Sequence, residues 1–164
     1  MLNKRTLGAF GFACCAALAQ PASAATSTTG DLSVIAVVAD TCILATGTAL
    51  SFATVNTATT SNEVTPGLVT VTCTATRSAI TVTLDGGDNL DGSDRQMKST
   101  NNDLLPYEVF SDSGHTEAVA VNGTIYDKGV TAAIPQVIPV YGQVPAGSYN
   151  AGAYSDTITV TLNY

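Results

Sequence analysis

Residues 154–164 alternate strictly between two kinds of side chain. Apolar residues take every second position and polar residues take the positions between them: Ile158, Val160, Leu162 and Tyr164 on one face, and Thr157, Thr159, Thr161 and Asn163 on the other. Successive side chains of a β-strand point to opposite faces of its sheet, so this period predicts an antiparallel strand with one buried face. The pattern runs to the last residue of the sequence, with no hairpin turn after it. We therefore expect a sheet edge at which another chain can pair.

Residues 1–24 predict a secretory signal peptide. Lys4 and Arg5 form its positive region, residues 7–18 form its short apolar region, and Ala22-Ser23-Ala24 is a cleavage motif of small residues. Cleavage after Ala24 would leave 140 residues, which suffice for one domain with its own core. No other apolar stretch approaches the roughly 20 residues that span a bilayer, so we expect an exported chain without membrane insertion.

The mature chain is acidic. All thirteen acidic residues follow Ala24, but only four basic residues do, Arg77, Arg95, Lys98 and Lys128, which gives a net charge of −9 with His115 neutral. This charge disfavours nucleic acid and anionic lipid as partners. The composition is rich in Thr, Val, Ala and Gly and low in Lys and Glu, with no helical period of useful length. It predicts an all-β fold.

Two cysteines, Cys42 and Cys73, remain once the signal peptide and its Cys14 and Cys15 are removed. In an oxidising compartment an isolated pair predicts one disulfide. Closing this loop of about 32 residues would stabilise the fold by roughly 3.7 kcal/mol in the chain-entropy model. A zinc site would need four ligands in a closer grouping, and a catalytic thiol would need a neighbouring base, so neither is expected.

Strand-like runs recur along the chain at short intervals. They cover residues 48–55, 67–75, 78–84, 104–110, 118–121, 134–141 and 154–164. Short strands separated by turn residues predict a two-sheet sandwich rather than a layered α/β fold. The alternation within residues 67–73 places Cys73 on the inward face, where a disulfide could join this strand to the first one.

Residues 29–40, which precede the first mature cysteine, also alternate. Leu32, Val34, Ala36 and Val38 share one face, and no hairpin turn joins this segment to the rest of the chain. One interpretation is an ordinary first strand of the sandwich. In the other, residues 25–40 form a donor strand that fills the free edge of a second molecule, and residues 41–164 form the sandwich domain.

Two local features suggest ligand or catalytic sites but fail on inspection. Residues 85–94 are acidic and glycine-rich, as in a calcium loop, but aligning Gly92 with the obligatory glycine of an EF-hand puts Gly87 and Lys98 at ligand positions. We expect a solvated turn there. His115 follows the turn residues 111–114, which predicts an exposed loop, and no nucleophile motif accompanies it. No cofactor, metal site or catalytic residue is expected, and the chain is not predicted to be an enzyme.

Several motifs together resemble the spore coat protein U domain family, which includes pilin subunits of the archaic chaperone–usher type. Beside the signal peptide and Cys42, the matching blocks are Thr29-Gly30, Leu50-Ser51-Phe52, Val71-Thr72-Cys73, Arg95-Gln96-Met97, Leu105-Pro106-Tyr107, residues 141–147 (YGQVPAG) and residues 152–157 (GAYSDT) with the final alternating strand. They cover essentially the whole mature chain. The family commonly has Phe-Gly where this sequence has Phe52-Ala53, and often a Trp after the Tyr107 region, where this chain has none.

The resemblance implies an incomplete immunoglobulin-like β-sandwich that lacks its C-terminal strand. By this resemblance a periplasmic chaperone holds the subunit, an outer-membrane usher receives it, and the N-terminal segment of the next subunit completes it. Leu32, Val34, Ala36 and Val38 would be the donor side chains, and Ile158, Val160, Leu162 and Tyr164 would line the acceptor groove. The implied product is a fimbrial fibre at the cell surface, for adhesion and biofilm formation.

Two further functions compete with a pilus subunit. A spore-coat or cell-surface protein of the same fold could use strand pairing to build a protective layer. A secreted carbohydrate-binding sandwich would need exposed aromatic platforms, and the chain has six Tyr, four Phe of which two lie in the signal peptide, and no Trp.

Overall fold

The structure is a computed structural model that describes residues 27–37, 39–55 and 61–164. The predicted signal peptide and Val38 lie outside these residues. The chain forms two units, Met1–Ala36 and Val37–Tyr164, and the second unit contains every strand of the described residues. Within the described part, no helix is long and apolar enough to cross a membrane.

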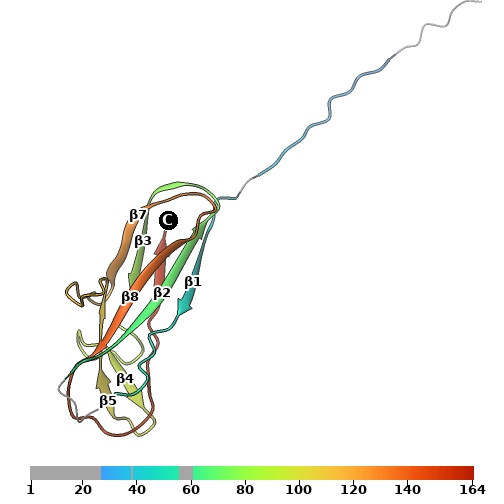
Figure 1. The fold of residues 1–164 in the computed structure, drawn as a ribbon. Helices are drawn as coiled ribbons and strands as arrows, with labels where there is room; N and C mark the ends of the chain where they lie inside the picture. The colour runs from blue at the N-terminus through green and yellow to red at the C-terminus, as the bar shows by residue number, and fades with distance from the viewer. Residues whose placement is uncertain (1–26, 38, 56–60) are drawn as a thin grey trace, which may run out of the picture. The chain divides into compact units, whose positions relative to one another are not determined.

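Three antiparallel sheets make up the second unit. The first has the order β1-β2-β8-β6: Cys42–Thr48, Glu63–Cys73, Gln136–Val144 and Glu108–Phe110. The second has the order β10-β3-β7: Val160–Asn163, Arg77–Leu84 and Gly123–Val130. The third is small, with the order β5-β4-β9: Leu104–Pro106, Gln96–Ser99 and Tyr154–Ser155. Figure 1 shows β1, β2 and β8 side by side, with β4 and β5 at the opposite end of the sandwich from the C-terminus.

The first two sheets face each other across a core built from alternating strand residues. From β2 come Val69, Val71 and Cys73, and from β3 come Ile80 and Val82, all at most 4% exposed. Because every second residue of each strand points inward, the two sheets bury one face each and leave Thr-rich outer faces. The predicted all-β sandwich is therefore confirmed.

The strand boundaries differ from prediction in the first half of the chain. The first strand is Cys42–Thr48, and residues 49–55 form none. Leu50 and Phe52 are half-buried while Ser51 is exposed, so side-chain burial follows the predicted alternation, although no backbone ladder forms. A hydrophobic period shows which side chains face the core and does not show which backbone groups pair. The register of β1 with β2 shifts between Thr46 and Thr48, just before the chain leaves the ladder.

β7 was not predicted, and no strand forms at residues 118–121, where one was expected. The β7 sequence, GTIYDKGV, contains Gly, Asp and Lys, which are depleted in strands. Two register shifts against β3 also break its alternation. The short β4 was missed for a similar reason, since four residues are too few to show a period.

Candidate functional site

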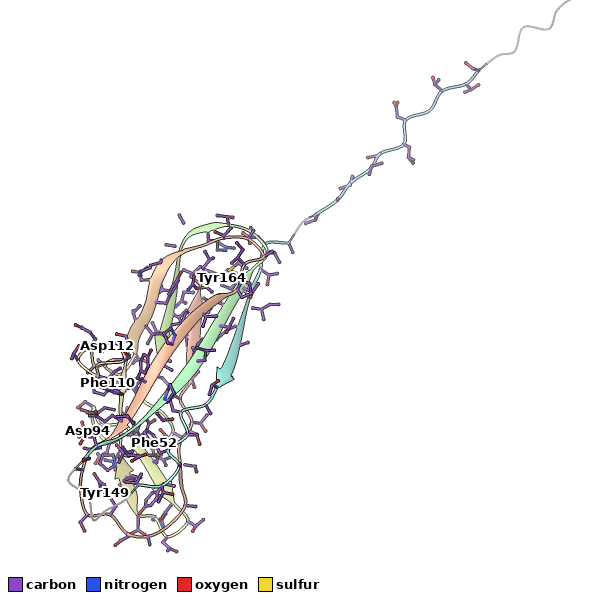
Figure 2. The ribbon with its side chains drawn as sticks, in the orientation of Figure 1. Phe52, Asp94, Phe110, Asp112, Tyr149 and Tyr164 are labelled. Atoms are coloured by element: carbon purple, nitrogen blue, oxygen red, sulfur yellow. A yellow bond between two sulfur atoms is a disulfide. The ribbon has the colours of Figure 1, made fainter. Side chains whose placement is uncertain are left out.

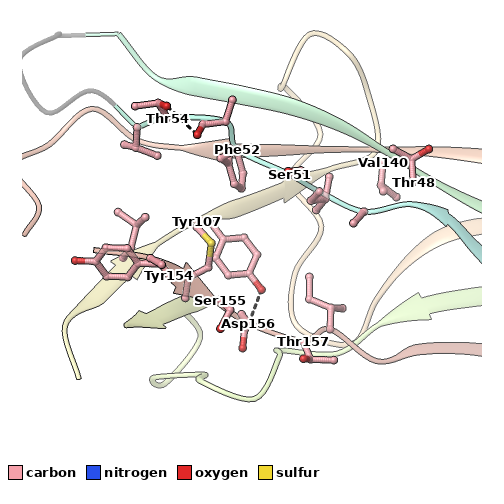
Figure 3. Close-up of a pocket in the computed structure, with 18 of the residues that line it drawn as sticks. Thr48, Ser51, Phe52, Thr54, Tyr107, Val140, Tyr154, Ser155, Asp156 and Thr157 are labelled. Atoms are coloured by element: carbon pink, nitrogen blue, oxygen red, sulfur yellow. Dashed lines mark hydrogen bonds between the residues drawn. The ribbon is translucent and has the colours of Figure 1, made fainter. Parts of the chain in front are cut away.

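A groove opens between the free edges of the two main sheets. β1 ends one sheet and β10 ends the other, and in the described residues neither has a strand on its outer side. Between them lies a cavity of about 1010 Å³, bordered by residues 46–55 on one wall and residues 149–158 and Val160 on the other. We call this cavity the lateral groove. Figure 3 shows its two walls, with Phe52 on one and Asp156 and Thr157 on the other.

The floor of the lateral groove is apolar. Six side chains line it, five from the three sheets and one, Tyr107, from between β5 and β6: Val69, Leu84, Met97, Leu105, Tyr107 and Val140. Five of them are at most 6% exposed, and Met97 is half-buried. An apolar, concave surface of this kind favours apolar side chains as occupants, because their transfer out of water is favourable.

One wall depends on a glycine in β8. Leu50 and Phe52 lie against Gly142, where a Cβ atom would stand 2.8 Å from Cζ of Phe52 and 3.3 Å from Cδ2 of Leu50. Glycine thus allows the irregular segment after β1 to pack directly on the sheet. This contact explains two of the motif blocks, because Leu50-Ser51-Phe52 and the 141–147 block meet here.

The opposite wall carries the residues that the sequence predicted for the acceptor strand. Ile158 and Val160 line the lateral groove and are half-buried. Leu162 lies beyond the groove and packs against the core of β2 and β3. Tyr164 does not line the groove. It is 54% exposed, with the guanidinium of Arg77 4.8 Å from its ring centre.

The backbone of this wall is also available for pairing. The N–H of Asp85 donates to the carbonyl of Thr159, so these two residues form a hydrogen-bonded pair. Bonding alternates along antiparallel strands, so Val160 and Leu162 turn their N–H and C=O groups away from β3, toward the free edge. An added strand would satisfy these groups.

The predicted donor segment has exposed side chains. Leu32 is 89% exposed, Val34 is 86% exposed, and Ala36 is also exposed. Ile35 and Val37, on the other face of the alternation, are 84% and 91% exposed. Residues 27–37 form no strand, and the first strand of the sandwich begins at Cys42.

Cys42 and Cys73 form a disulfide. It joins the first residue of β1 to the last residue of β2, which are register partners. Cys73 is 1% exposed, on the inward face that its alternation predicted. The bond fixes β1, the strand from which one wall of the lateral groove continues.

The sequence did not predict a polar cluster beside the groove, formed by Tyr107, Asn89 and Asp156. The hydroxyl of Tyr107 donates to Oδ2 of Asp156 at 2.5 Å, drawn as a dashed line in Figure 3. The backbone N–H and the side-chain amide of Asn89 donate to Oδ1 of Asp156, at 3.1 and 2.9 Å. Burial, together with this hydrogen bond to a carboxylate, raises the pKa of Tyr107, so its hydroxyl stays protonated and remains a donor.

Arg95 is the buried cation beside this cluster, 5% exposed. Its guanidinium donates only to backbone carbonyls: Leu84 at 3.4 Å, Asp85 at 2.7 and 2.9 Å, Val119 at 2.6 Å and Ala120 at 3.0 Å. Arg95, Tyr107 and Asp156 each belong to a different motif block. The sequence singled out each of the three as part of a motif block, but only the fold shows that they lie together.

His115 differs from its prediction as an exposed loop residue. It is half-buried, and its ring centre lies 5.2 Å from that of Phe110 and 6.0 Å from that of Tyr141. The carboxylate of Asp112 accepts hydrogen bonds from Gly114, Thr116 and Glu117 and closes the loop around it. Figure 2 shows Phe110 and Asp112 side by side on this flank of the sandwich.

In the part of the chain that the structure describes, no three His, Cys, Asp or Glu side chains gather in a way that could hold a metal ion. Residues 85–94 form a turn that contains two glycines at positive φ, Gly87 and Gly92, and a bridge between Asp91 and Asp94.

The fold and the lateral groove define a β-sandwich whose two sheets leave neighbouring edges open. The chain belongs to the Spore Coat Protein U domain family, whose model matches residues 28–161. This match confirms the resemblance drawn from the motif blocks.

A similar fold occurs in a chain of the crystal structure of the CsuC–CsuE chaperone–tip adhesion subunit pre-assembly complex, from the archaic chaperone–usher Csu pili of Acinetobacter baumannii. The TM-score is 0.54 and the sequence identity is 23%. The similarity covers 77% of this chain and 40% of that chain, so this chain spans less than half the length of its structural neighbour. The expected immunoglobulin-like sandwich with unclosed sheets is thereby confirmed. No curated protein matches the sequence.

Proposed function

We propose that this protein is a structural subunit of an archaic chaperone–usher pilus that polymerises by donor-strand complementation. In this assembly the N-terminal segment of one subunit enters the lateral groove of the next. The observation that carries the proposal is the open apolar groove between β1 and β10, in a chain that also has an exposed, alternating apolar segment.

The free edge of β10 supports this pairing. In an extended conformation the donor segment could run beside this edge as an added strand. It would pair with the free backbone groups of Val160 and Leu162 and direct alternate side chains onto the apolar floor.

Burial of the donor side chains gives a stable contact. Leu32, Val34, Ala36 and Val38 would contribute roughly 1 to 3 kcal/mol each, or about 5 to 10 kcal/mol before ordering costs. Main-chain hydrogen bonds along β10 add to this. Such a contact dissociates slowly, as a fibre that bears load requires.

The remaining partners follow from the same geometry. A subunit with an open groove exposes a large apolar surface, which promotes aggregation unless a partner covers it. The proposed cover is a periplasmic chaperone, and an outer-membrane usher exchanges it for the next subunit. The structural neighbour comes from a chaperone–subunit complex, which supports this proposal.

Head-to-tail addition of this kind does not close on itself, so its product is a filament rather than a ring. We place the subunit outside the cell, in a fimbrial fibre exported through the periplasm, with attachment and biofilm formation as its roles. Its contribution there is mechanical and involves no reaction. A protective surface or spore coat built from the same contact is the second candidate, favoured by the description of the family.

A charge placed on the donor face tests the proposal. Val34→Asp should abolish polymerisation, because an unpaired carboxylate would be buried against the apolar floor. Polymers are to be counted by negative-stain microscopy after co-expression with the cognate chaperone. Ser33→Asp is the matched control, since it adds the same charge one residue away, on the opposite face.

Fibres should persist in Ser33→Asp and disappear in Val34→Asp, while a chaperone-bound subunit is recovered from both. Normal fibres from Val34→Asp would contradict the donor role of this face. Loss of fibres in both variants would contradict the assignment of faces.

A further inference from the structure

The last segment of the chain changes sheets at Asp156. Before it, Tyr154 and Ser155 of β9 pair with Ser99 and Lys98 of β4. After it, β10 pairs with β3, from Val160 opposite Leu84 onward. Residues 156–159 belong to no strand, and Thr157 and Ile158 line the lateral groove. The wall of the groove thus bends where a single strand was predicted.

In a regular ladder, the pairing with β3 would include the residues that precede β10. Extending its register with β3 would place Ile158 opposite Gly86 and Asp156 opposite Asp88. The described residues contain no such pairing. Instead, hydrogen bonds from polar side chains hold residues 156–158 outside this register.

Asp85 and Arg95 end the ladder at its last hydrogen-bonded pair. Arg95 donates hydrogen bonds from two N–H groups to the backbone carbonyl of Asp85. The N–H of Thr159, which would bond to that carbonyl in a regular ladder, donates to the carboxylate of Asp85 at 2.8 Å. A side chain has replaced the main-chain acceptor at this point.

Asp156 then anchors the bend. Its carboxylate accepts three hydrogen bonds, from Tyr107 below the groove and twice from Asn89 in the neighbouring turn. The Nδ2 group of Asn89 also reaches the carbonyl of Ser155 at 3.4 Å. Tyr107 itself is 6% exposed, so the anchor rests on a side chain held in the core.

The position of Gly87, beside the carboxylate of Asp156, requires a glycine. Its φ of +80° is a conformation that residues with a side chain rarely adopt. A Cβ atom there would overlap the carboxylate of Asp156. The turn that holds the anchor therefore requires a glycine for two independent reasons.

We infer that Asp156 is a positioning residue for donor-strand entry: held by Tyr107 and Asn89, it keeps residues 156–158 out of main-chain pairing with the 85–89 turn, on a path that leaves their part of the lateral groove open to an incoming strand. This inference rests on the proposed function. Because the backbone of Thr157 and Ile158 makes no hydrogen bond to other described residues, its N–H and C=O groups remain for that strand.

The test uses the full-length mature chain carrying Val34→Asp, which cannot act as donor but keeps its own groove. The probe is a fluorescent peptide of residues 27–40 of this chain. Its association rate and affinity are measured by fluorescence anisotropy, and the urea midpoint of each variant is measured by tyrosine fluorescence.

Adding Asp156→Asn or Gly87→Ala should weaken peptide binding by about tenfold or more, the change expected from losing one charge-assisted hydrogen bond that orders the wall. Tyr107→Phe should act in the same direction. Asp88→Asn is the matched control, because it removes one charge from the same turn at an exposed residue with no hydrogen bond to Asp156. Its binding should be unchanged.

Ile80→Val separates positioning from general stability. Ile80 is 1% exposed and lies in the core of β3, away from the groove lining, and its truncation costs about 1 kcal/mol. At an equal shift of the urea midpoint, Asp156→Asn should weaken peptide binding more than Ile80→Val does. Equal weakening in these two variants, or unchanged binding in Asp156→Asn, would overturn the positioning role. If the Val34→Asp background itself took up no peptide, the proposed function would fail, and the inference with it.

Discussion

Asp85 shows how one residue both ends a strand and shapes the groove beside it. Partial burial opposes its charge, but hydrogen bonds from the backbone N–H groups of Gly87 and Thr159 outweigh burial and lower the pKa of Asp85 below its ordinary value. The charged form is therefore the one that fits the fold. An alternating pattern of apolar residues contains no information about such a bond, because the partners are 74 residues apart.

This lowered pKa predicts how stability depends on pH. The unfolded chain takes up a proton at Asp85 near pH 4, whereas the folded chain does so only at lower pH. The stabilisation is complete above about pH 4 and is lost as the pH falls through the folded pKa. Urea midpoints measured between about pH 7 and pH 2 should therefore fall at the acid end.

Asp85→Asn should flatten that acid limb. Asp112, whose pKa is also lowered, by hydrogen bonds from Glu117 and Thr116, should keep part of the slope in this variant. Asp88→Asn serves as the control and should leave the profile unchanged. An identical acid limb in Asp85→Asn and in the parent chain would contradict the role given to this carboxylate.

At the scale of the element, the sequence predicted faces better than it predicted pairing. Burial along residues 154–164 alternates as expected, with Ile158, Val160 and Leu162 half-buried and the threonines between them exposed. Yet the backbone pairs with two different strands and, among the described residues, with none between residues 156 and 158. The period of the side chains depends only on which of them are buried. Strand pairing also depends on contacts such as that between Arg95 and Asp85, and such contacts involve residues that lie in turns or far apart in the sequence.

The site was predictable to the same degree. Ile158 and Val160, two of the four residues predicted for the acceptor strand, line the lateral groove, and the alternation predicted their inward face. Their role as acceptors stays a prediction. The other wall, around Leu50 and Phe52, was expected to be a strand and became an irregular segment held on Gly142. The polar cluster of Tyr107 and Asp156 could not be predicted, since nothing local in the sequence indicates that they meet.

The disulfide gives a prediction for the first strand. β1 lies at a sheet edge, where it pairs only with β2 among the described strands, and the Cys42–Cys73 bond fixes its start. Replacing both cysteines with Ser should lower stability by up to about 3.7 kcal/mol and reduce the yield of subunit, since the unfolded chain regains the freedom of a loop of about 32 residues. Chemical unfolding of the mature chain and of the double variant checks this. Equal urea midpoints would mean that the bond does not support the sandwich.

At the scale of the whole molecule, four of the family motif blocks meet around the lateral groove. Leu50 and Phe52 lie on one wall, Met97, Leu105 and Tyr107 on the floor, and Asp156 with the start of the final alternating strand on the other wall. These motif blocks therefore shape an open sheet edge. Such an edge invites pairing with other chains unless it has a defined occupant.

The most direct test of that occupant compares the mature chain with and without residues 25–40, each expressed alongside a candidate periplasmic chaperone. Size-exclusion chromatography and negative-stain microscopy report the size and form of the products. Donor-strand assembly predicts heat-resistant polymers from the mature chain, and only a one-to-one complex with the chaperone from the truncated chain. A stable monomer in both cases would contradict it and would indicate a self-contained surface or binding protein.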